Sequence, residues 1–83
     1  NRLVVRQLRC GEPRWCTDPP GQLFQATVQL RAHATPLRAH VDPNGDELTI
    51  NLLEPTFGIA PGQMAAIYRG AQVLGSAIIN TAS

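Results

Sequence analysis

The chain has 83 residues, of which 43% are hydrophobic and 16% are charged. This length supports one small domain, and the balance of apolar and charged residues excludes a disordered chain. Arginine supplies all seven positive charges, and six acidic residues reduce the net charge to +1, which excludes the broad basic surface of a nonspecific nucleic-acid binder. Any contact with RNA must therefore be local.

The sequence contains no apolar run that approaches the roughly 20 residues of a membrane helix, so we expect no membrane contact. The first residue is Asn1 rather than methionine. We therefore interpret residues 1–83 as a single domain that belongs to a longer protein.

The first third of the chain predicts one strand and one loop. Residues Arg2–Arg9 are β-branched in the middle and polar at intervals, which is typical of a short strand. Residues Glu12–Gln22 contain three prolines and a glycine, which predicts a loop. Trp15 lies within that loop, and we expect its ring to pack on the core as a lid.

The middle of the chain predicts three strands from an alternating pattern. Apolar and polar residues alternate through Leu23–Ala34 and, after a proline, through Leu37–Val41, as in strands with one buried face. Pro43-Asn44-Gly45-Asp46 predicts a turn. A third alternating strand follows at Leu48–Leu52, and Glu54-Pro55 is expected to end it because proline cannot donate a hydrogen bond to a neighbouring strand.

The last third predicts a turn followed by a hairpin. Pro61-Gly62 suits a type II turn, and two apolar runs flank Arg69-Gly70-Ala71, which indicates a hairpin connection. No segment shows sustained helical spacing of apolar residues. We therefore predict an all-β fold of about six strands. A small closed or nearly closed antiparallel barrel is favoured because closure removes exposed edges.

Four basic side chains form the main candidate site. If strands Leu23–Ala34 and Leu37–Val41 form a hairpin, Arg31, His33, Arg38 and His40 project from one face. Guanidinium and imidazole groups suit contacts with RNA phosphates. The alternative is an ordinary solvated sheet face, but four basic groups with no acidic residue among them favour the RNA contact.

The cysteines and histidines suggest two other kinds of site. Cys10, Cys16, His33 and His40 have the residue types of a zinc site, but their spacing is unlike that of zinc fingers. A catalytic role for Cys10 or Cys16 requires a lowered thiol pKa, and an all-β chain offers no helix N-terminus to lower it. We expect two reduced thiols, no metal site and no catalytic residue.

The last third also carries a resemblance to a known family. Three of its segments are similar to the C-terminal signature of the tRNA-specific 2-thiouridylase family: Gly58-Ile59-Ala60-Pro61-Gly62-Gln63, Ile67-Tyr68-Arg69-Gly70 and Val73-Leu74-Gly75. Phe24–His33 resembles the strand of that family that carries an arginine pattern. In this resemblance Arg31 matches the arginine, and His33 stands where a second arginine is common. The resemblance covers nearly the whole chain.

The resemblance implies that residues 1–83 are a single C-terminal β-barrel domain of a longer multidomain protein, similar to the barrels of translation elongation factors. It also implies a cytoplasmic parent enzyme, a sulfurtransferase that uses ATP with magnesium to adenylate the wobble uridine and then transfers sulfur to it. The catalytic residues and the ATP site of the family lie in upstream domains, so this barrel is expected to have no cofactor of its own.

The same resemblance implies a set of partners. These are tRNA, which the barrel is expected to help hold, the upstream catalytic and central domains of the same chain, and a sulfur-donor protein that acts through the parent enzyme. The alternative is a structural or protein-docking barrel, as in translation factors and aminomethyltransferases, with Leu53, Phe57 and Ile59 as an exposed apolar patch.

Overall fold

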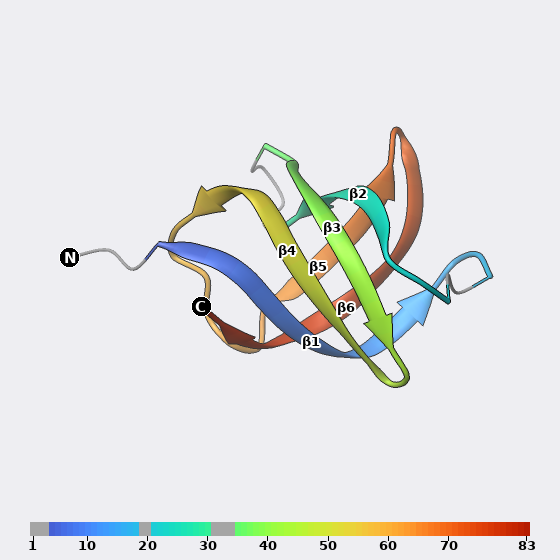
Figure 1. The fold of residues 1–83 in the computed structure, drawn as a ribbon, viewed down its shortest axis with the longest axis horizontal. Helices are drawn as coiled ribbons and strands as arrows, with labels where there is room; N and C mark the ends of the chain where they lie inside the picture. Colours follow the sequence, from blue (N-terminus) through green and yellow to red (C-terminus); the bar gives the residue numbers. More distant parts are fainter. Residues whose placement is uncertain (1–3, 19–20, 31–34) are drawn as a thin grey trace.

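The computed structural model describes residues 4–18, 21–30 and 35–83. These residues form six strands: β1 (Val5–Trp15), β2 (Phe24–Gln29), β3 (Leu37–Asn44), β4 (Glu47–Thr56), β5 (Met64–Arg69) and β6 (Gln72–Ala82). The strands close into an antiparallel barrel in the order β1-β4-β3-β2-β5-β6 (Figure 1). The predicted all-β barrel is thereby confirmed. Within the described ranges no helix is long and apolar enough to cross a membrane.

The connections explain the strand order. Three of them are hairpins between neighbouring strands, namely β2–β3, β3–β4 and β5–β6. The other two, from β1 to β2 and from β4 to β5, join strands that are not neighbours. Because β1 and β4 are antiparallel, these two connections lie at opposite ends of the barrel (Figure 1).

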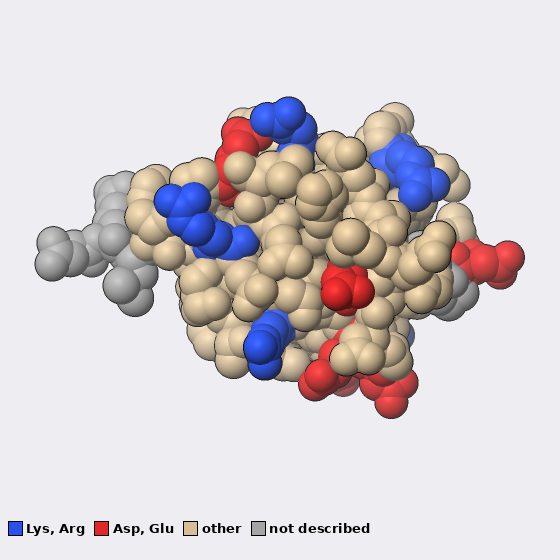
Figure 2. Space-filling view, in the orientation of Figure 1, with Lys and Arg blue, Asp and Glu red and all other residues tan. Residues whose placement is uncertain are grey.

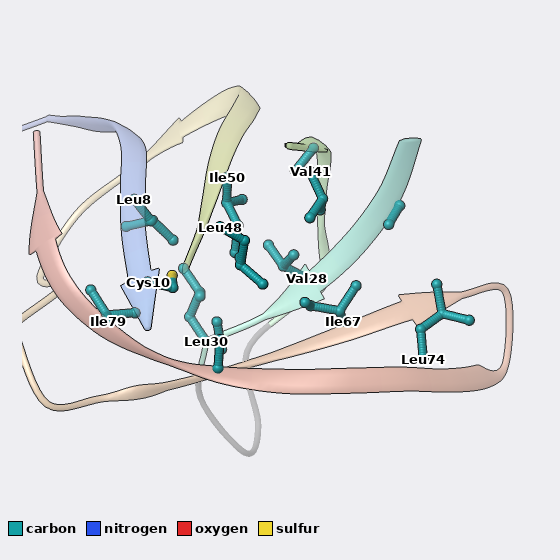
Figure 3. Packing of buried hydrophobic residues seen from close by; sticks show 14 of the residues in the cluster. Leu8, Cys10, Val28, Leu30, Val41, Leu48, Ile50, Ile67, Leu74 and Ile79 are labelled. Carbon is teal, nitrogen blue, oxygen red and sulfur yellow. The ribbon is translucent and has the colours of Figure 1, made fainter. Parts of the chain in front are cut away.

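Inward-facing side chains from all six strands fill the barrel (Figure 3). Leu8, Val28, Ile50, Ile67 and Ile79 are completely buried. Burial of such side chains is the main stabilising term available to a domain of this size.

Partly buried side chains close the two ends of the barrel. Trp15 packs against the core, as predicted, and its ring meets Phe24 edge to face at a centroid distance of 6.3 Å. Ile59, in the connection from β4 to β5, also packs against the core. The end of β1 and the connection from β4 to β5 therefore each contribute a side chain that excludes water from the barrel.

The first strand is longer than predicted. β1 continues through Trp15, so the prediction of a loop from Glu12 onward is wrong for residues 12–15. The pairing of β1 with β6 shifts register between Gly11 and Arg14, and Glu12 has a φ of 50°. This bulge places Pro13 where the strand can tolerate a residue without an N–H group.

The fourth strand also passes a proline. β4 was expected to end at Glu54-Pro55, but it continues to Thr56. Gln7 pairs with Asn51 and Val5 pairs with Thr56, so residues 52–55 form a wide irregularity opposite Arg6. Pro55 lies within that irregularity, where no regular ladder hydrogen bond is required of it.

The Pro61-Gly62 turn has the predicted geometry. Gly62 has a φ of 94°, and the Gln63 N–H donates a 3.3 Å hydrogen bond to the Ala60 carbonyl oxygen, as a type II turn requires. The Ala60 N–H donates to the Gln63 side-chain Oε1 at 2.7 Å. The Gly62 N–H also donates to the Ile79 carbonyl oxygen at 2.8 Å, which ties the turn to β6.

Candidate nucleic-acid interface

Two of the four predicted contact residues lie side by side on β3. Arg38 and His40 face outward because Ala39 and Val41, which alternate with them, are buried. β2 and β3 pair as the predicted hairpin. Arg31 and His33 lie outside the described residues, so their part in the face stays a prediction.

An acidic residue stands beside the first of these side chains. Arg38 Nε lies 3.1 Å from Glu54 Oε1, and the two side chains are 63% and 51% exposed. The expectation that no acidic residue lies among the basic groups is therefore wrong. An exposed pair of this kind contributes little stability, and a guanidinium has five N–H donors. Arg38 can therefore still bind an anion, in competition with Glu54.

Uncharged polar residues lie opposite His40 on the two neighbouring strands, while the charged residues Arg38 and Asp42 lie two positions away on β3. The strand registers place His40 between Gln25 on β2 and Asn51 on β4, and Asn51 is opposite Gln7 on β1. The Gln7 Nε2 donates a 2.9 Å hydrogen bond to Asn51 Oδ1. We name Gln7, Asn51, His40 and Gln25 the polar row. Sequence alternation predicted that His40 faces outward, but only the register reveals its neighbours.

The charge distribution limits what this face can bind. Figure 2 shows basic and acidic side chains interspersed on the visible face, with no continuous basic surface. Binding of a polyanion to this face must therefore depend on individual arginines rather than on a broad positive field.

The cysteines occupy different environments. Cys10 and Cys16 are both free thiols, Cys10 buried and Cys16 exposed. Cys10 faces the core while His40 faces outward, so these two residues cannot share a zinc ion. The part of the chain that the structure describes contains no group of three residues that could hold a metal ion.

Burial raises the pKa of the Cys10 thiol to about 11, the opposite of what a nucleophilic cysteine needs. We expect iodoacetamide at pH 8 to alkylate Cys16 in the folded chain and both thiols in the unfolded chain, as measured by mass spectrometry. Because the folded pKa lies above the ordinary value of 9.0, the stability that this thiol contributes is lost as pH rises from 9 to 11. Equal alkylation rates at both thiols in the folded chain would contradict this prediction.

The aminomethyltransferase beta-barrel domain family matches residues 5–79. The chain is 53% identical over 79 residues to the tRNA-specific 2-thiouridylase MnmA of a Nocardioides species, a match that covers 95% of this chain and 21% of that relative.

Two further relatives carry the same name. Identity is 42% over 79 residues to the protein of Acidothermus cellulolyticus, and 41% over 83 residues to that of Kineococcus radiotolerans. Each match covers 95% of this chain, and 22% and 23% of the respective relative. The chain thus spans about a fifth of the length of the curated relatives that it matches.

Proposed function

Because the chain belongs to the aminomethyltransferase beta-barrel domain family, and because its relatives are tRNA-specific 2-thiouridylases, we propose that it is the C-terminal barrel of such an enzyme. In this role the barrel helps to hold tRNA and is not itself catalytic. The face formed by Arg38, His40 and the rest of the polar row contacts the RNA, with Arg31 and His33 as further contacts.

The exposure of Arg38 beside His40 on β3 is the observation that supports this RNA-contacting face. Arg38 is well exposed and stands in line with His40 on β3, so a guanidinium and an imidazole are presented together from a rigid strand. Their outward direction agrees with a contact to phosphate oxygens. An RNA phosphate that binds the Arg38 guanidinium must compete with the Glu54 carboxylate, which forms an ion pair with it.

The chemistry of the proposed parent enzyme lies outside this chain. Upstream domains adenylate the wobble uridine with ATP and magnesium, and a sulfur-donor protein supplies the sulfur. The proposed setting is the cytoplasm. The part of this barrel is to position the tRNA, which raises the effective concentration of the uridine at the catalytic domain.

Replacing Arg38 with alanine is expected to weaken tRNA binding about five- to tenfold at low salt. It is also expected to lower the slope of log affinity against log salt by about one, because one phosphate contact is lost. The measurement is fluorescence anisotropy with a tRNA transcript and the full-length parent protein. Arg14→Ala is the matched control, since Arg14 is an exposed arginine on β1 outside the face.

The reciprocal variant sharpens this test. Glu54→Gln removes the carboxylate that pairs with Arg38 and is therefore expected to strengthen tRNA binding about two- to threefold. If Arg38→Ala and Glu54→Gln both leave affinity and salt slope unchanged, the proposed RNA face is wrong.

A docking function is the second candidate. Leu53 and Phe57 are 44% and 46% exposed, as is Val4 at 45%. Val5 pairs with Thr56, which brings Val4 and Phe57 together at one end of the barrel. Ile59 packs against the core, so its predicted place in an exposed patch is wrong. Docking against an upstream domain is favoured if both variants above behave as the native protein.

A further inference from the structure

A polar groove lies along β1, β4, β6 and the end of β3, separate from the Arg38 side chain. Its volume is about 350 Å³, at the small end of the range of ligand sites. Its lining includes Cys10 and Leu48 together with six polar residues: Arg9, Asn44, Glu47, Thr49, Asn80 and Thr81.

The strand registers place Arg9 at the centre of this groove. Arg9 is opposite Thr49 on β4 and opposite Thr81 on β6, so this exposed arginine has a threonine beside it on each neighbouring strand. Among the described residues Arg9 has no ion pair or side-chain hydrogen bond. Its donors are therefore available to a ligand.

A β-bulge adds a further polar group to the groove. Arg9 pairs with Thr81 but Cys10 pairs with Ile79, which leaves Asn80 as an extra residue on β6. As a result Asn80 and Thr81 are both exposed although they are consecutive. Bulges redirect side chains in this way and are common beside functional sites.

A glycine supports the position of the Asn80 carboxamide. A Cβ atom at Gly11 would lie 2.8 Å from Asn80 Nδ2, closer than the two atoms can stand. The absence of a side chain at Gly11 therefore allows the carboxamide to rest against the β1 backbone. Asn80 has no side-chain hydrogen bond within the described ranges, so its donor and acceptor are both available.

We propose that this groove binds one ribose-phosphate unit of an RNA backbone. Arg9 binds the phosphate, where the guanidinium supplies charge and paired donors. Thr49, Asn80 and the Glu47 carboxylate bind the ribose. The carboxylate accepts a hydrogen bond from the 2′-hydroxyl that DNA lacks, and the Thr49 hydroxyl donates one to the oxygen of the same 2′-hydroxyl.

The proposal rests on the proposed tRNA-holding function and adds a second contact on the same outer surface. Thr49 in the groove and Asn51 in the polar row are two residues apart on β4 and face the same way, about 7 Å from each other along the strand. A single RNA segment can therefore reach both.

The test measures affinity of the full-length parent protein for a tRNA transcript, and for RNA and DNA oligonucleotides of one sequence. Arg9→Ala is expected to weaken binding of all three about five- to tenfold and to lower the salt slope by about one. Thr49→Val keeps the β-branched shape without the hydroxyl. It is expected to weaken RNA binding about threefold while leaving DNA affinity and the salt slope unchanged. Arg14→Ala is the control, and circular dichroism verifies folding of each variant.

The outcomes separate this proposal from the proposed function. If Arg38→Ala weakens tRNA binding and Arg9→Ala does not, the proposed ribose-phosphate site in the groove is wrong, while the proposed RNA contact at Arg38 is retained. Equal effects of Thr49→Val on RNA and DNA overturn the assignment of the ribose contact. If the native parent protein binds no tRNA, both proposals are overturned together.

Discussion

Replacing Ile67 with alanine is expected to lower the free energy of unfolding by about 3–4 kcal/mol. Ile67 is fully buried on β5, and neighbouring side chains from the closed barrel surround it (Figure 3). A closed barrel cannot easily contract around the cavity, because its strands are held by ladders on both sides. In a domain of 83 residues, such a loss is a large part of the total stability.

Thermal unfolding followed by circular dichroism measures this effect, and the midpoint is expected to fall by about 15 °C. Ile78→Ala is the matched control, because Ile78 is only half-buried on β6 and its loss should cost much less. Equal destabilisation by the two variants would show that Ile67 does not occupy a closely packed core.

Replacing Gly75 with alanine is expected to destabilise the barrel by about 2 kcal/mol or more. A Cβ atom at this position would lie 2.4 Å from the Arg14 carbonyl oxygen and 2.9 Å from the Trp15 ring. Gly75 pairs with Trp15 in the ladder that closes the barrel between β1 and β6. The added methyl group must therefore separate these strands or displace the tryptophan that covers one end of the core.

Chemical denaturation of Gly75→Ala and Gly21→Ala measures this effect against a suitable control. A Cβ atom at Gly21 would have no neighbour within 4 Å, so that substitution is expected to leave stability within about 0.5 kcal/mol of native. Tryptophan fluorescence provides a second readout, because Trp15 should become more exposed in Gly75→Ala alone. If both variants have the same free energy of unfolding as the native protein, β1 and β6 are not closely packed at Gly75 in solution.

The local pattern of the chain predicted most of the strands and the direction of their side chains. Alternation over Leu37–Val41 placed Arg38 and His40 on the outer face, and the structure agrees. The turn at Pro61-Gly62 was equally predictable. In each case the pattern depends only on residues close in sequence, because the side-chain period of a strand and the φ preferences of proline and glycine are local properties.

The strand ends and the neighbours of the site residues could not be predicted in the same way. β1 and β4 continue past Pro13 and Pro55, since irregular pairing with strands distant in sequence accommodates a residue without an N–H. The partner of Arg38 is Glu54, which lies 16 residues away on β4. Sequence alternation alone gives no register between strands and so does not reveal this pair.

The order of residues predicted an all-β barrel, the outward direction of Arg38 and His40, and the family that the chain resembles. These properties follow from residue order within each strand and turn. The closure of the barrel brings Glu54 to Arg38 and places Arg9, Thr49 and Asn80 around one groove. The physical reason is that barrel closure fixes the register of strands far apart in sequence, and a bulge of one residue changes which side chains meet.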